Sequence, residues 1–146
     1  MADDGLSAAE RAAVKQRAAE LRAEARRQKA ADKVAAAARD AAEAIAAMPD
    51  EERALAERVH ALVAEHAPRL AARTWYGFPA YAREDGTVVA FFQPATKFGT
   101  RYSTLGFQDA ARLDDGSLWP TSFAITAVDA AAEATIADLL RRADPA

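Results

Sequence analysis

All eleven aromatic side chains of this 146-residue chain lie between Trp75 and Phe123. Each buries roughly 150–250 Å² in a folded protein, so aromatic residues dominate the energetics of a core. The hydrophobic content of 51% is misleading by comparison, because 42 residues are alanine, which buries little area. The sequence therefore predicts a folded unit in the last two thirds of the chain, preceded by an alanine-rich extension.

The extension is expected to be helical. Residues 6–48 contain neither glycine nor proline, and Ser7 and Glu10 have the spacing of a capping box. An unbroken helix to residue 47 would be roughly 60 Å long, so we expect it to break, to project or to pack against a partner. Pro49 interrupts the pattern. The predicted organisation is a charged helical extension over residues 1–49 and an α+β domain over residues 50–146.

Within the second part, Asp50 is the expected N-cap of a helix that continues to about His66. Short β-type segments bounded by turn residues follow, and Asp129 is the expected N-cap of a last helix that ends near Arg142. The expected strands cover residues 73–76, 80–83, 88–93, 101–107 and 119–125. The fold class predicted is α+β, with a small antiparallel sheet of about five strands and helices packed on one face.

The strand over residues 88–92 is apolar on both faces. Strict alternation places Val88, Ala90 and Phe92 on one face, and Val89 and Phe91 on the other. Two or three short helices can cover only one face of a small sheet. The second face then needs the N-terminal segment, a partner subunit or a ligand.

The segment TWYGFPAY over residues 74–81, the hairpin after it, the VVAFF strand and the Arg101-Tyr102 strand start together resemble the YdhG-like family of small bacterial domains of unknown function. The resemblance covers about residues 50–142 and implies an α+β fold with helices on one side of a curved sheet. Some members of that family are described as frataxin-like intracellular iron chaperones. Iron is therefore a cofactor that only the resemblance implies.

A pocket on the second sheet face is the main functional hypothesis, since ligand pockets combine apolar walls with a few placed polar groups. Lys97 and Arg101 flank Gly99 and favour an anionic ligand. The expected ligand-binding residues are Trp75, Tyr76, Pro79, Tyr81, Phe91, Lys97, Arg101 and Tyr102. The alternative interpretation is that most of these rings belong to the core. We expect a non-catalytic binding domain for a small anionic compound, a carboxylate or a phosphate, or for a metal ion.

A basic stripe is the most unusual feature of the extension. At 100° per residue its members fall within a sector of about 60°. The expected partner-binding residues are Arg11, Lys15, Arg22, Arg26, Lys29 and Lys33. An acidic partner, nucleic-acid phosphates or a neighbouring copy could compensate them, or the stripe is a solvated helix surface. The alternative function is thus a protein-interaction or homodimerisation module that uses this helix and the second sheet face.

Several function classes are disfavoured. Without cysteine there is no disulfide framework or thiolate metal site, and a net charge of −3 gives no general attraction to nucleic acid or anionic membranes. The chain begins without a signal-peptide pattern and has no long apolar run, so we expect a cytoplasmic protein without a membrane partner. His60 and His66 lie about 240° apart on one helix. No catalytic or metal-ligating motif is present, so an enzyme is not the expected function.

Overall fold

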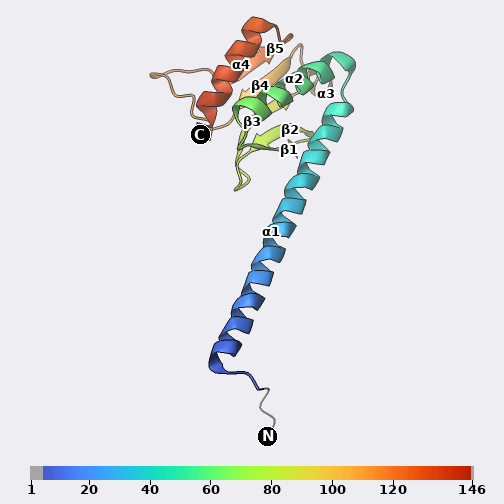
Figure 1. Cartoon of the computed structure of the whole chain (residues 1–146). Coiled ribbons are helices and arrows are strands. Elements are labelled where there is room, and N and C mark those ends of the chain that lie inside the picture. Colours follow the sequence, from blue (N-terminus) through green and yellow to red (C-terminus); the bar gives the residue numbers. More distant parts are fainter. Residues whose placement is uncertain (1–4, 146) are drawn as a thin grey trace. The chain divides into compact units, whose positions relative to one another are not determined.

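The computed structural model describes residues 5–145. They divide into two compact units, with the boundary between Ala35 and Ala36. The fold class is α+β, as predicted (Figure 1). The helices are α1 (Ala8–Ala46), α2 (Asp50–His66), α3 (Ala95–Phe98) and α4 (Ala130–Ala143). The strands are β1 (Ala71–Trp75), β2 (Phe78–Ala82), β3 (Val88–Gln93), β4 (Ser103–Phe107) and β5 (Ser122–Ile125).

Helix α1 runs without a break for 39 residues. Its N-terminus has the expected cap, because the backbone N–H of Glu10 donates to Ser7 Oγ at 3.1 Å. Ala41 and Ile45 near its C-terminus are buried, and Ile45 packs in the same core cluster as Met48. The last turns of α1 therefore belong to the second compact unit, which begins at Ala36, well before the boundary that Pro49 suggests.

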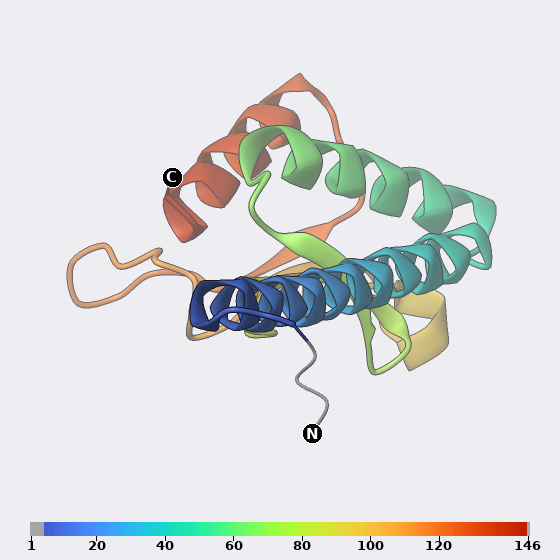
Figure 2. The same cartoon turned by 60° about the horizontal axis from the view of Figure 1, so that its bottom comes forward.

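The five strands form one antiparallel sheet in the order β1-β2-β3-β4-β5. Helices α2 and α4 contact each other and lie side by side over one face of it (Figures 1 and 2). Their side chains share a core with Tyr81, Phe92 and Leu105 from the strands. The prediction of a small antiparallel sheet with helices on one face is confirmed.

The helix ends differ in one respect from the expected caps. Asp129 is the N-cap of α4, where its carboxylate accepts the N–H of Ala132 at 2.8 Å. At α2, however, Pro49 occupies the N-cap position and Asp50 is the first helical residue. Asp50 instead pairs with Arg53 at 3.0 Å. The acidic first turn still stabilises the helix through its dipole.

The strict alternation expected in β3 fails at Val89. Val89 packs in the core cluster with Ala90 and Phe92 instead of lying with Phe91 on the other face. The register between β2 and β3 is irregular here, since Tyr81 pairs with Ala90 whereas the next residue pairs with Val88. An irregularity of this kind leaves one residue without a partner and changes the direction of its side chain.

Candidate ligand site

The sheet face opposite α2 and α4, called the outer face below, carries a cluster of five aromatic rings. Trp75 and Phe78 pair across β1 and β2, and their ring centroids lie 5.8 Å apart. Phe91 from β3 lies 5.5 Å from both, Tyr76 packs 4.9 Å from Trp75, and Phe98 from α3 packs 5.5 Å from Phe78. Three predicted site residues, Trp75, Tyr76 and Phe91, therefore meet in this cluster.

The turn between β1 and β2 exposes one of these rings. Tyr76 has φ of 51°, the only positive φ of a non-glycine residue within residues 5–145, and 73% of the residue is exposed. Gly77 follows with φ of 79°. Lys97 Nζ donates to the Gly77 carbonyl at 3.1 Å, which ties α3 to this turn. The predicted basic residue Lys97 thus lies beside the aromatic cluster, but its ammonium already has a backbone partner.

Two predicted ligand-binding residues lie inside the core. Pro79 and Tyr81 belong to β2, and both are fully buried. The Tyr81 hydroxyl forms a hydrogen bond with His60 Nδ1 at 3.0 Å. Burial raises the pKa of Tyr81 and lowers that of His60, so both groups are neutral near pH 7. Tyr81 joins the sheet to α2 and does not share a surface with Trp75 or Phe91.

The remaining two predicted residues line a separate pocket of about 490 Å³ at the start of α2. We call it the Glu52 pocket; Arg101, Tyr102, Asp50 and Glu51 also line it. The Arg101 guanidinium lies 5.3 Å from the centroid of the Tyr102 ring. Three carboxylates face one guanidinium here, which is a poor environment for a simple anion.

Another pocket, of about 710 Å³, has an excess of positively charged side chains, which an anion requires. It is lined by Arg69, Arg83, Glu84, Arg112, Asp144 and Pro145. We call it the arginine pocket. The arginines come from three segments: the turn before β1, the end of β2 and the loop after β4. Three guanidiniums face two carboxylates, which leaves an excess of one positive charge.

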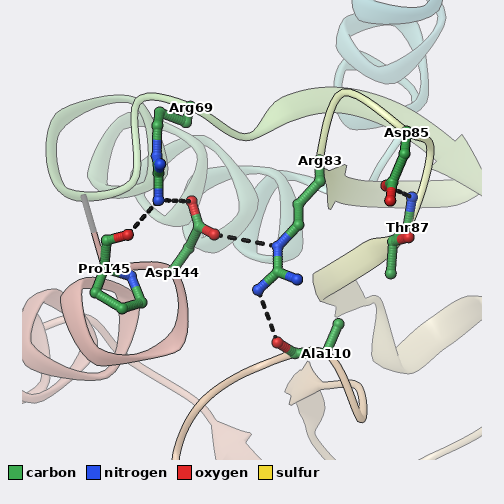
Figure 3. A network of polar contacts seen from close by, with 7 residues as sticks. All are labelled: Arg69, Arg83, Asp85, Thr87, Ala110, Asp144 and Pro145. Atoms are coloured by element: carbon green, nitrogen blue, oxygen red, sulfur yellow. Dashed lines mark hydrogen bonds and ion pairs between the residues drawn. The ribbon is translucent and has the colours of Figure 1, made fainter.

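Asp144 organises two of the three arginines (Figure 3). It is a buried residue at the C-terminal end of α4, and its two carboxylate oxygens lie 3.2 Å from Arg83 Nε and 3.5 Å from Arg69 Nη2. Arg83 Nη2 also donates to the Ala110 carbonyl at 2.9 Å, and Arg69 donates to the Pro145 carbonyl. These contacts fix the positions of both guanidiniums.

The hairpin between β2 and β3 supports the position of Arg83. The backbone N–H of Arg83 donates to the Thr87 carbonyl at 2.9 Å. The Asp85 carboxylate accepts the Thr87 N–H at 2.9 Å, and this hydrogen bond lowers the pKa of Asp85 (Figure 3). Gly86 has φ of 89°, as the predicted Asp-Gly turn requires. A short, well-bonded turn therefore holds the strand end that carries Arg83.

Arg112 differs from the other two arginines. Its backbone N–H donates to the Ala143 carbonyl at 3.0 Å, which holds it next to Asp144. Its guanidinium is exposed and has no hydrogen bond or ion pair with any residue in the described part of the chain. Five N–H donors are thus free beside two guanidiniums that Asp144 has already oriented.

The sequence does not predict this pocket. Its basic residues are widely separated along the chain, and no local motif connects them. The pairing of β1 with β2 and the return of α4 to the sheet bring them together. A single indication was available: Asp144 follows a helix whose last turn is basic, and an acidic residue there opposes the helix dipole unless cations compensate it.

Other predicted groups remain apart. His60 and His66 have different partners, Tyr81 and Arg141, at 3.0 Å each. Among residues 5–145 no three histidine, aspartate or glutamate side chains are grouped so that they could hold a metal ion. No helix in the same range combines the length and hydropathy needed to cross a membrane.

The basic stripe is exposed along α1. Arg11 donates to the Leu6 carbonyl at 2.7 Å. The side chains of the other five residues make no hydrogen bond or ion pair with the described residues, whereas the side chain of the neighbouring Arg17 pairs with Glu20 and Glu24. Those five are Lys15, Arg22, Arg26, Lys29 and Lys33.

Comparisons of the chain with protein-family models, with curated proteins and with solved structures gave no match.

Proposed function

We propose that this chain is a binding domain for a small anionic compound, a carboxylate or a phosphate, and that the arginine pocket is its site. The observation that carries the proposal is the unpaired guanidinium of Arg112 beside Arg69 and Arg83 in a pocket of about 710 Å³. That volume falls in the range of about 300–1,000 Å³ typical of small-ligand sites. The charge excess has the sign that an anion requires.

Guanidinium chemistry supports this ligand class. The planar fork of an arginine matches the oxygen spacing of carboxylates and phosphates, and bidentate contacts are among the strongest hydrogen bonds in proteins. Arg83 uses Nε and Nη2 for Asp144 and Ala110, so its Nη1 donors remain free. An anion would therefore meet free donors from Arg83 and Arg112 without displacing Asp144.

The role of Asp144 is to pre-organise the site. Its charge lowers the local potential, but its contacts remove the rotational freedom of Arg69 and Arg83 before a ligand arrives. A side chain that is already fixed loses less conformational entropy when a ligand binds, which lowers the free-energy cost of binding by about 0.5–1.5 kcal/mol for each such side chain.

Isothermal titration calorimetry with inorganic phosphate and with succinate tests the proposal. Wild-type protein should bind at least one of the two saturably, and Arg112→Ala should weaken that binding at least about tenfold, equivalent to 1.4 kcal/mol. Arg73→Ala is the matched control, because Arg73 is exposed on β1 and does not line the pocket. Equal affinities of wild type and Arg112→Ala, or no saturable binding of either anion, would exclude the arginine pocket as the site.

A second candidate function is self-association through the outer face, and the conformation of Tyr76 favours it. A non-glycine residue with positive φ is strained, and such strain is concentrated at functional sites. Here it presents an exposed aromatic ring, and Phe98, which packs against Phe78 of the same cluster, is exposed as well. Light scattering after size-exclusion chromatography should then show a dimer that Tyr76→Asn disrupts; a monomeric wild type would remove this candidate.

The metal-ion alternative rests on the YdhG-like resemblance alone. Anaerobic calorimetric titration with ferrous ion tests it directly. Saturable binding at micromolar concentration would support an iron-chaperone role, and its absence would remove that role.

A further inference from the structure

The Glu52 pocket has a property that a small-anion site does not require. Glu52 is only 8% exposed, although it is a carboxylate at the start of a helix. Its Oε1 accepts the backbone N–H of Thr96, the second residue of α3, at 2.6 Å. Its Oε2 is buried and has no hydrogen-bond partner among residues 5–145. A buried carboxylate oxygen without a partner is costly, so this oxygen needs a donor that the described residues do not supply.

The surroundings show why Glu52 is held in place. Ser103 Oγ accepts the N–H of Ala95 at 3.1 Å, and Glu52 accepts the next N–H along the chain. These two acceptors satisfy the first amides of α3. The carboxylate of Glu52 is thus fixed by one oxygen, and the other oxygen is left for a further contact.

The opposite charge in this pocket is also without an ion pair. The Arg101 guanidinium lies over the ring of Tyr102, and no carboxylate among residues 5–145 forms an ion pair with it. Asp50, by contrast, is engaged by Arg53 at 3.0 Å. The pocket is therefore lined by one carboxylate with an oxygen that has no partner, Glu52, and by one cation without an ion pair, Arg101.

We propose that the Glu52 pocket binds a small zwitterion with an ammonium group and a carboxylate, the chemistry of a free amino acid. The ammonium pairs with the Glu52 carboxylate, and the ligand's carboxylate accepts from the Arg101 guanidinium. The volume of about 490 Å³ is sufficient for such a compound. The apolar lining, which includes Leu55 and Ile125, favours an aliphatic side chain.

The charge at the mouth adds a preference among amino acids. Asp50 and Glu51 line the same pocket, so the carboxylates outnumber the single guanidinium. A ligand with a second positive charge is favoured over one with a second negative charge. L-lysine should therefore bind more tightly than L-glutamate.

Three compounds that differ by one group each test the proposal by calorimetry: L-leucine, 3-methylbutylamine, which lacks the carboxylate, and 4-methylpentanoate, which lacks the ammonium. L-leucine should bind at least tenfold more tightly than either analogue. Glu52→Gln keeps an acceptor for the Thr96 N–H but loses the charge, and it should abolish the preference over 4-methylpentanoate. Arg101→Ala should abolish the preference over 3-methylbutylamine, and Arg101→Lys should restore part of it.

The site shares no lining residue with the arginine pocket, so the two proposals fail separately. Arg112→Ala should leave L-leucine binding unchanged, and circular dichroism should show that Glu52→Gln and Arg101→Ala are folded. Three results would each overturn the inference: equal binding of the three compounds, no saturable binding of L-leucine at millimolar concentration, or a preference for L-leucine over 4-methylpentanoate that survives Glu52→Gln.

Discussion

Replacing Ile45 tests whether the end of α1 is part of the folded domain. Ile45 is 5% exposed and packs in the core cluster, although it precedes Pro49 in the alanine-rich segment. Ile→Ala at a buried site costs about 2–5 kcal/mol, from lost burial and the cavity that remains. Alanine is the better helix former by a few tenths of a kcal/mol, which lowers the net cost slightly. We expect Ile45→Ala to reduce the free energy of unfolding by about 2–4 kcal/mol.

Val34→Ala is the matched control, because Val34 lies in the same helix and is 53% exposed. It should change stability by no more than about 0.5 kcal/mol. Urea unfolding followed by circular dichroism measures both variants, and with an m-value of about 1–3 kcal/mol/M the Ile45→Ala midpoint should fall by roughly 1 M or more. Deleting residues 1–49 should destabilise the domain, and deleting residues 1–35 should not. Equal midpoints for Ile45→Ala and Val34→Ala would refute the assignment of this helix end to the core.

Three further perturbations have expected outcomes. Gly106→Ala would place a Cβ 2.1 Å from the Phe91 ring and should cost about 1–3 kcal/mol in urea unfolding, whereas the same change in a Phe91→Leu background should cost clearly less. Burial lowers the pKa of His60 in the folded protein, so the unfolded chain binds more protons below about pH 6.5. The free energy of unfolding should therefore be highest above about pH 6.5 and should fall as the pH drops toward the folded-state pKa. His60→Gln should lack this part of the pH dependence, and an unchanged pH profile would contradict the role given to His60. Asp144→Asn should lower stability by about 1–2 kcal/mol, since its partners are partly exposed. It removes a negative charge from the arginine pocket and keeps one oxygen that can accept from Arg83, so phosphate binding should tighten; an unchanged phosphate affinity in a folded Asp144→Asn protein would argue against the pocket.

Local patterns in the sequence were sufficient to predict most of the fold. The Ser7 cap, the Asp129 cap and the Asp-Gly hairpin each depend on residues within a few positions of one another, and all three are present in the structure. Helix α3 was missed because four residues after a proline carry no periodicity. The strand expected over residues 119–125 begins only at Ser122, beyond Pro120, which has no N–H to donate to a sheet.

The candidate sites were harder to predict because they depend on contacts between distant segments. The aromatic residues that follow one another near Trp75 were recognised as a group, and three of them do meet. Side chains along β2 nevertheless alternate between the two faces of the sheet, so Tyr81 lies in the core and Phe78 lies on the opposite face. The burial of Glu52 depends on α3, which lies 44 positions away in the chain. No periodicity near Glu52 distinguishes it from the exposed acidic residues beside it.

The central claim is that the arginine pocket holds an anion, and side-chain NMR tests it most directly. The Nε–Hε signals of Arg69, Arg83 and Arg112 should shift together and saturably as inorganic phosphate is added to ¹⁵N-labelled protein, while the signal of Arg73 stays in place. Signals of all four arginines that drift equally without saturation, or that do not move, would contradict the claim.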